Sequence, residues 1–349
     1  MKMGIIGYGN MAHWHKDTVA KIKDLEICGI WDINETARKH AEEDGLFVYN
    51  SLDEMLDDSE VNFVLIATDN DVHHTIAIKS MEKGKHVVCE KPITLNCKML
   101  NEMIAVSKKT GMHFTVHQNR RWDTDFCTVK KILENGKLGT PFRIESRVHG
   151  SRGISNTWRR KKEKGGGVIY DWGVHLFDQL LLLKKGVNIK SVYATKQNVT
   201  TAFVEDGFTA FITFEDDFQA LIEVQTSDFL EASRWKVFCE NGTAEIYDWL
   251  ANGKTVCAVC DNEQEIVPFV TASGYTKTMA PRTDDTIKEL PIEKCEEDIT
   301  EFYRNVIDVI NKKAEPLITN TEMLNVLRTL EAVFKSIETN QAVACDLII

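Results

Sequence analysis

The stretch Gly7-Tyr8-Gly9-Asn10-Met11-Ala12 directly follows the apolar run Met3-Gly4-Ile5-Ile6. This is the G-x-G-x-x-A spacing of a strand that turns into a helix at a dinucleotide site. Gly7 permits the tight turn, Gly9 lets the backbone approach a pyrophosphate, and Ala12 keeps helix and sheet close. The free N–H groups and partial positive charge at the start of the helix then favour the phosphates. The stretch therefore predicts a dinucleotide-binding β-α-β unit.

A carboxylate follows at the distance that such a unit requires. Asp32 ends the second predicted strand, Glu26–Trp31, about 20 residues beyond Ala12, where an acid accepts hydrogen bonds from the adenosine ribose hydroxyls. The same carboxylate would repel the 2′-phosphate of NADP, so NAD is favoured. Arg38 and Lys39 leave NADP open as an alternative.

Outward from this unit, short apolar runs alternate with helical patterns, which is typical of a doubly wound parallel sheet. We assign residues 1–121 to this domain. The expected strands are Lys2–Gly7, Glu26–Trp31, Asn62–Thr68, His86–Glu90 and His113–Gln118, and the expected helices are Met11–Ile22, Glu35–Glu43, Val72–Lys83 and Leu95–Lys109.

The pattern changes in residues 122–349, which we assign to a C-terminal α+β domain with a large open mixed or antiparallel sheet. Period-two runs indicate strands, an apolar run indicates a helix over Gly167–Leu183, and Thr271–Leu290 is polar and aperiodic. Other expected strands are Phe142–His149, Ser191–Thr200, Gly207–Phe214, Gln219–Thr226, Trp235–Glu240 and Ala244–Tyr247, and other expected helices run from Asp123 to Asn135, Glu297–Lys312 and Thr321–Thr339.

Composition narrows the class of protein. The 42 Lys and Arg residues against 53 Asp and Glu give a net charge of −11, which repels nucleic acid. No apolar run reaches the length of about 18 residues that a membrane helix needs. Because an apolar strand begins almost at the first residue, no leader segment is expected, and we predict a cytoplasmic protein.

The nine cysteines are odd in number and scattered, so we expect buried free thiols. The pair Cys257 and Cys260 lacks partner ligands at zinc spacing and would point to opposite faces of a strand. We assign no metal.

Two further motifs carry chemistry. Glu90-Lys91-Pro92 ends a strand of the parallel sheet, at the edge where open α/β sheets bind ligands. Asp171 and His175 are one helical turn apart, so the carboxylate can orient the imidazole of an acid–base pair. Asp178 stands three residues beyond His175 and can help from the other side.

Taken in order, these motifs resemble the glucose-fructose oxidoreductase / inositol dehydrogenase / MocA (Gfo/Idh/MocA) family. The resemblance covers essentially the whole chain. Within the family, Gln118-Asn119-Arg120-Arg121-Trp122-Asp123 and Thr157-Trp158-Arg159 look like the branch of scyllo-inositol and sugar dehydrogenases. The other motifs that carry the resemblance are Gly7-x-Gly9-x-x-Ala12, Ala67-Thr68-Asp69-Asn70-Asp71-Val72-His73, Glu90-Lys91-Pro92 and Gly165-Gly166-Gly167 leading to Asp171-x-x-x-His175.

The resemblance implies a Rossmann domain, and dimers or tetramers formed through the C-terminal sheet. It implies that Lys91, Asp171 and His175 meet over the nicotinamide, with Asn70 and His73 along the cofactor channel. The residues expected to bind the cofactor are Gly7, Gly9, Asn10, Met11, Asp32, Thr68, Asn70, His73, Glu90 and Lys91.

The predicted reaction is hydride transfer between the nicotinamide and a secondary alcohol of a sugar, cyclitol or glycoside. His175 takes the hydroxyl proton as base, Lys91 hydrogen-bonds the same oxygen and stabilises the developing negative charge, and Asp171 orients and polarises this pair. The alternative is that Lys91 and His175 have each other's role. Further candidates for substrate contacts are Arg121, Trp158 and Arg159, because sugars are held by apolar ring faces and charged donors. One alternative is a glycoside-cleaving enzyme whose tightly bound NAD transiently oxidises C3. Another is a non-catalytic cofactor-binding regulator.

Overall fold

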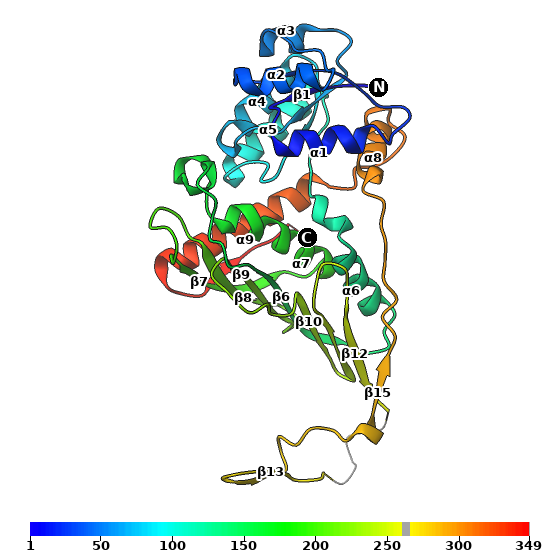
Figure 1. Cartoon of the computed structure of the whole chain (residues 1–349), viewed down its shortest axis with the longest axis vertical. Coiled ribbons are helices and arrows are strands. Elements are labelled where there is room, and N and C mark those ends of the chain that lie inside the picture. Colours follow the sequence, from blue (N-terminus) through cyan, green and yellow to red (C-terminus); the bar gives the residue numbers. More distant parts are fainter. Residues whose placement is uncertain (260–265, 349) are drawn as a thin grey trace.

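The computed structural model describes residues 1–259 and 266–348 and contains two domains, one above the other in Figure 1. The N-terminal domain is built on a five-stranded parallel sheet of order β2-β1-β3-β4-β5. Helices pack against this sheet. Its elements are β1 Lys2–Ile6, α1 Asn10–Val19, β2 Glu26–Trp31, α2 Glu35–Glu43, α3 Leu52–Asp57, β3 Phe63–Ile66, α4 His73–Glu82, β4 His86–Cys89, α5 Cys97–Thr110 and β5 Phe114–Val116.

The C-terminal domain carries a nine-stranded mixed sheet of order β15-β12-β11-β10-β6-β9-β8-β7-β16. All its strand pairs are antiparallel except β6 with β9. Helices α6, α7 and α9 lie on one face of it (Figure 1). The elements are α6 Thr124–Glu134, β6 Pro141–His149, α7 Val174–Leu183, β7 Ile189–Gln197, β8 Gly207–Phe214, β9 Gln219–Gln225, β10 Trp235–Cys239, β11 Gly242–Ile246, β12 Gly253–Ala258, β13 Phe269–Thr271, β14 Gly274–Thr276, β15 Ile287–Leu290, α8 Thr300–Ile310, α9 Asn320–Thr339 and β16 Val343–Cys345.

The predicted fold class is confirmed, and α2, β2 and β8 have the predicted bounds. The interpretation of Thr271–Leu290 as aperiodic is wrong at both ends of the segment. Thr271 ends β13 of an exposed hairpin, and Ile287–Leu290 pairs with β12 at the edge of the large sheet. Edge strands bury little, so their apolar alternation is weak.

The segment before His175 also differs from the predicted continuous helix. Ile169–Gly173 forms a π-helical turn, and the α-helix α7 begins only at Val174. A π turn is wider than an α turn, so residues four apart no longer stack directly above one another. Such turns are common at functional sites.

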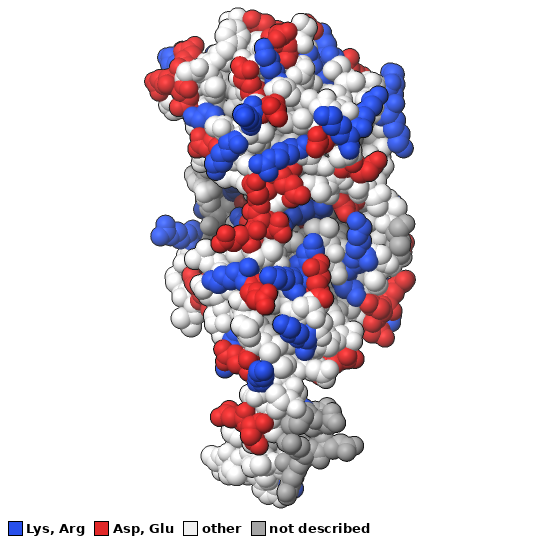
Figure 2. Space-filling model, turned by 90° about the vertical axis from the view of Figure 1, so that its right-hand side faces the viewer, with Lys and Arg blue, Asp and Glu red and all other residues white. Residues whose placement is uncertain are grey.

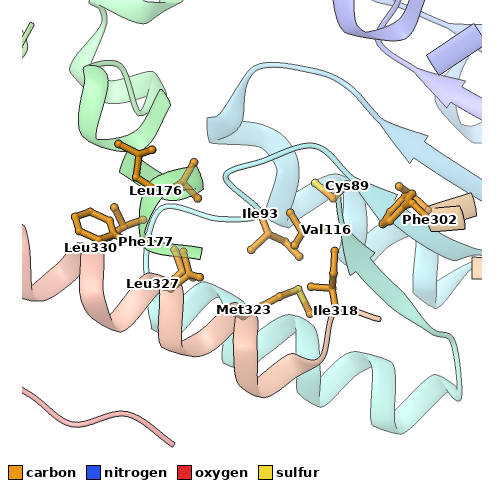
Figure 3. Close-up of a cluster of buried hydrophobic side chains, with 14 of the residues drawn as sticks. Cys89, Ile93, Val116, Leu176, Phe177, Phe302, Ile318, Met323, Leu327 and Leu330 are labelled. Carbon is orange, nitrogen blue, oxygen red and sulfur yellow. The ribbon is translucent and has the colours of Figure 1, made fainter. Parts of the chain in front are cut away.

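Apolar packing joins the two domains. Cys89, Ile93 and Val116 from the N-terminal sheet region lie in the same buried cluster as Met323 and Leu327 of α9 (Figure 3). The late helix α8 returns to the N-terminal domain and packs against α1. The predicted domain boundary, between residues 121 and 122, falls inside the 3₁₀ turn Asn119–Trp122 that leads into α6.

The surface carries charges of both signs. On the face drawn in Figure 2, Lys and Arg side chains alternate with Asp and Glu. Within the described residues, no helix is long and apolar enough to span a membrane. Of the predicted thiols, Cys257 lies in β12 and is free, and Cys260 lies outside the described residues.

Candidate active site

The G-x-G-x-x-A loop has the features that a dinucleotide requires. Gly7 has φ of +88°, and a Cβ there would lie 2.7 Å from the carbonyl oxygen of Ala67, so only glycine suits the turn. A Cβ on Gly9 would meet no atom of the described residues within 4 Å, which leaves space for a ligand. Among the described residues, no side chain caps helix α1; its first turn has no acidic residue, and Asn10 and Met11 are exposed there. The first N–H groups are therefore free for a phosphate.

Asp32 follows β2 at the same edge of the sheet. Its carboxylate accepts hydrogen bonds from the backbone N–H groups of Tyr8 and Asn34, both at 2.6 Å. The bond to Tyr8 ties the acid to the glycine loop. The Arg38 guanidinium donates to the backbone carbonyl of Asp32 at 2.8 Å, so a cation also lies beside this position. These residues fit a nucleotide ribose.

Two predicted catalytic residues meet where the domains face each other. The Lys91 amine, just beyond β4, donates to the backbone carbonyl of Asp171 at 2.7 Å and to its Oδ1 at 3.0 Å. The Arg159 Nε donates to Oδ2 at 2.8 Å. Burial alone would raise the pKa of Asp171, but the charges of Lys91 and Arg159 lower it to about 2. Asp171 is therefore an anion held between two cations.

His175 is the third predicted catalytic residue, and it is buried in the first turn of α7. Burial first, and then the positive charges of Lys91 and Arg120, hold the pKa of His175 well below its usual value. The imidazole is therefore neutral near pH 7. Its Nδ1 is buried without a hydrogen-bond partner among the described residues. Because both oxygens of Asp171 bind cations, the structure couples Asp171 to Lys91 and Arg159 rather than to His175.

The remaining predicted cofactor residues lie after β3 and β4. Thr68 donates its hydroxyl to the carbonyl of Asp69, and Asn70 donates its amide to the carbonyl of Gly165 at 3.3 Å. His73 is fully buried, with ring nitrogens 2.9 Å from the carbonyl of Pro92 and 3.1 Å from that of Thr68. A neutral imidazole has one N–H, so one of these contacts is a hydrogen bond. His73 thus contacts the backbone at Pro92, directly after Lys91, and at Thr68.

Glu90 is also buried, and both its oxygens are engaged within the protein. Oε1 lies 2.8 Å from a ring nitrogen of His15 and 2.8 Å from one of His117, and Oε2 accepts the Lys91 backbone N–H at 3.2 Å. Its side chain therefore holds the backbone of Lys91 and has no oxygen free for a cofactor.

Among the predicted substrate residues, Arg159 and the Trp158 ring beneath its guanidinium lie next to Asp171, whereas Arg121 has other partners. Arg159 lies over the Trp158 ring at 4.6 Å and binds Asp171. The Arg121 guanidinium makes a bidentate pair with Asp178 at 2.6 and 2.8 Å, and it also contacts Glu322. Asp178 is therefore committed to Arg121 and not to His175.

A stack of rings and guanidinium groups beside His175 was missed by the sequence analysis. Arg120 lies between Trp172 and Trp249, at 4.4 and 4.7 Å from the ring centroids. Arg234 continues the stack from Trp249 to Trp235. Trp172 could have been noticed, since it adjoins Asp171, but no local signal predicts that the β11–β12 hairpin brings Trp249 there.

The glycine run at residues 165–167 allows the segment before the π turn to pack closely. Gly167 has φ of +101°, and a Cβ there would lie 2.1 Å from a carboxylate oxygen of buried Glu205. Glu205 in turn accepts the backbone N–H of Ile169. The run thereby places Asp171 opposite Lys91.

These features define an oxidoreductase-type nucleotide-binding domain joined to a second domain that completes the site. Residues 1–118 match the family model "Oxidoreductase family, NAD-binding Rossmann fold", and residues 126–245 match the "GFO/IDH/MocA C-terminal domain". The chain belongs to the Gfo/Idh/MocA oxidoreductase family, as the resemblance predicted.

The chain is also similar to individual proteins named as NAD-binding or as dehydrogenases. An NAD-binding protein from Listeria innocua has a crystal structure with a TM-score of 0.89 and 40% identity, covering 99% of this chain and 96% of that one. The scyllo-inositol 2-dehydrogenase (NADP(+)) of Bacillus subtilis is 25% identical over 341 residues, or 96% of this chain and 93% of its own. The glucose-6-phosphate 3-dehydrogenase of that organism is 28% identical over 211 residues, 59% of this chain and 60% of its own.

Proposed function

We propose that this protein transfers a hydride between NAD and a secondary alcohol carbon of a sugar, cyclitol or glycoside. The observation that carries the proposal is the contact of Lys91 with Asp171 beside a buried neutral His175, at the carboxyl edge of a dinucleotide-binding sheet. Similarity to relatives named as inositol and sugar-phosphate dehydrogenases supports the substrate class.

The residues divide the chemistry as follows. A bound nicotinamide supplies the hydride acceptor. Neutral His175 takes the proton from the substrate hydroxyl as general base. The Lys91 ammonium donates a hydrogen bond to the same oxygen and stabilises its developing negative charge. Asp171 holds the Lys91 amine in place through two contacts, and Arg159 keeps Asp171 ionised.

The cofactor is NAD rather than NADP in this proposal. The carboxylate of Asp32 would face the 2′-phosphate of NADP, and like charges repel. Arg38 binds the backbone of Asp32 and is the cation that would soften this preference. Comparing the affinities for NADH and NADPH tests the assignment, and a tighter NADPH complex would contradict it.

We also propose that the protein forms a homodimer or homotetramer through the outer face of the nine-stranded sheet. Tyr193 pairs with Phe211 across β7 and β8, and Phe211 with Leu221 across β8 and β9. These three side chains form an apolar row on the face opposite to the helices, and Tyr193 is 41% exposed. Apolar rows of this kind favour association. Sedimentation velocity tests this, and a monomer at micromolar concentration would contradict it.

The first experiment determines whether the isolated protein carries NAD and then follows NADH formation with inositols, aldoses and glycosides. NADH formed with one class establishes a dehydrogenase and its substrate. Free sugar released from a glycoside, without net NADH, would instead establish the redox-assisted cleavage. Neither product from any class, with NAD bound, would favour a regulator and contradict the proposal.

A further inference from the structure

Four buried polar side chains from four parts of the chain meet next to the backbone of Lys91. His15 comes from α1, Glu90 follows β4, His117 follows β5, and Tyr303 comes from α8 at the far end of the chain. All four are 5% exposed or less. Trp14 and Phe302 lie against the His117 ring, with centroids 5.3 and 4.9 Å away, so the surroundings are aromatic. Polar groups are costly to bury in such surroundings unless they bind one another.

The hydrogen bonds determine where the protons lie. Burial keeps the pKa of Tyr303 well above its usual value, so its hydroxyl stays protonated and donates to Nδ1 of His15 at 2.6 Å. Burial and repulsion from His117 lower the pKa of His15 to about 4, so its ring is neutral. Its single N–H is then on Nε2 and donates to Glu90. The hydrogen bonds therefore run in one direction: Tyr303 donates to His15, and His15 donates to Glu90.

Glu90 is the anion at the end of this sequence. Burial by itself would raise its pKa, but the hydrogen bonds from His117 and His15 hold the pKa of Glu90 well below its usual value. The second oxygen, Oε2, accepts the backbone N–H of Lys91. The Glu90 carboxylate is therefore fixed by three hydrogen bonds, and one of them holds the backbone of Lys91 in place.

His15, Glu90 and His117 are residue types that bind metal ions, and their ligand atoms lie within 4.8 Å of one another, so a metal site is an alternative interpretation. The distances argue for hydrogen bonds instead. Oε1 is 2.8 Å from both ring nitrogens, the ordinary length of a charge-assisted N–H···O bond. His15 already has a donor on its other nitrogen, so its tautomer is accounted for without an ion.

We propose that the buried cluster of His15, Glu90, His117 and Tyr303 is a positioning element for Lys91 and balances the positive charge that faces His175. This inference rests on the proposed function for its kinetic consequences. The groups that act on His175 are Lys91, Arg120 and His117, which disfavour its protonated form, and Glu90, which favours it. Through Tyr303, the cluster also makes the Lys91 region depend on α8.

Glu90→Gln tests the charge while keeping the shape. The matched control is Glu102→Gln, which removes a carboxylate paired with His74 at 2.9 Å outside the cluster. We expect Glu90→Gln to lower kcat about tenfold while the NADH dissociation constant changes by less than about threefold. The acid limb of the kcat profile should move to lower pH, because a negative charge that favours protonated His175 is gone. Unchanged kcat and an unchanged limb would overturn the proposal.

A second measurement needs no substrate, so it separates this inference from the proposed function. Reductive methylation followed by mass spectrometry gives the labelling rate of the Lys91 amine in the full-length protein. Loss of the charge-assisted bonds should make Lys91 react about fivefold faster in Glu90→Gln, and Glu102→Gln should match the wild type. Equal rates in all three proteins would overturn the positioning role, whatever the activity.

If Glu90→Gln does not fold, Tyr303→Phe provides the same test with a smaller change. It removes one hydroxyl and keeps the ring that packs in the cluster. We expect Lys91 labelling to be about twofold faster and the melting temperature to stay within a few degrees. Labelling at the wild-type rate would overturn the proposal.

Discussion

The Lys91 amine reaches Asp171 with two hydrogen bonds, at 2.7 Å to the backbone carbonyl and 3.0 Å to the carboxylate. Lys91 follows a strand of the nucleotide-binding domain, and Asp171 lies in a π turn of the other domain. Both side chains are mostly buried, with 17% and 15% exposed. The contact therefore joins the two domains at the point where the chemistry is proposed.

Replacing Gly9 should separate cofactor binding from folding. Gly9→Ala places its Cβ in open space and has an ordinary backbone conformation, with φ of −94°, so the fold should be retained. The methyl group would occupy the approach path of the pyrophosphate, so we expect NADH affinity to fall about tenfold or more. Fluorescence titration with NADH measures it. Affinity equal to the wild type would contradict the site.

Gly7→Ala is the matched comparison. Its Cβ would collide with the carbonyl of Ala67, and φ of +88° is strained for alanine. We expect a lower melting temperature as well as lost NADH binding. A stable Gly7→Ala protein would contradict the geometry of the turn.

Arg121 should contribute to stability rather than to substrate binding. Arg121→Met leaves Asp178 and Glu322 near each other without their cation, so urea unfolding should show a loss of about 3–5 kcal/mol. The double variant Arg121→Met with Asp178→Leu should recover part of that loss, because one buried charge is also removed. Active enzyme with raised KM and unchanged stability would show instead that Arg121 binds substrate.

Neighbouring arginines illustrate what the sequence can predict and what it cannot. The glycine loop, Asp32 and the strand–helix alternation are local patterns, and they predict the first domain almost element by element. Arg120 and Arg121 stand side by side in the same motif, yet one lies between two tryptophans beside His175 and the other lies in a buried ion pair. Which way each side chain points depends on Trp249 and Glu322, which are far away in sequence.

The cluster under Lys91 shows the same limit. His15, Glu90, His117 and Tyr303 are separated by up to 288 positions and share no motif. Their meeting follows from the order of the strands β4 and β5 and from the return of α8 to α1. Only the fold brings them together. Likewise, the edge strand β15 has too little burial to show a period in its sequence.

Stability should fall as the pH decreases below neutrality. Burial lowers the pKa of His15 and of His113 to about 4, below the ordinary histidine value of about 6.5 that applies when the chain is unfolded. The unfolded chain therefore binds more protons between pH 6.5 and 4. Each histidine then removes up to about 1.4 kcal/mol of stability per pH unit in that window. Above pH 6.5 both are neutral in either state and the effect vanishes.

Urea unfolding from pH 7.5 to 5 measures this dependence. His113→Gln should show a shallower loss of stability than the wild type, because one of the histidines that take up a proton on unfolding is absent. A flat stability curve for the wild type across the window would contradict the neutral, buried state of these histidines.

The roles of Lys91 and His175 in hydride transfer are tested by comparing the turnover of the wild type with that of Lys91→Ala and His175→Ala, using the substrate found among the inositols, aldoses and glycosides. We expect turnover to fall by at least about a hundredfold in each variant, because each loses a group acting on the substrate oxygen. The NADH dissociation constant should stay within about threefold of the wild type, because the glycine loop and Asp32 are intact. Near-normal turnover in both variants would contradict the catalytic roles of Lys91 and His175.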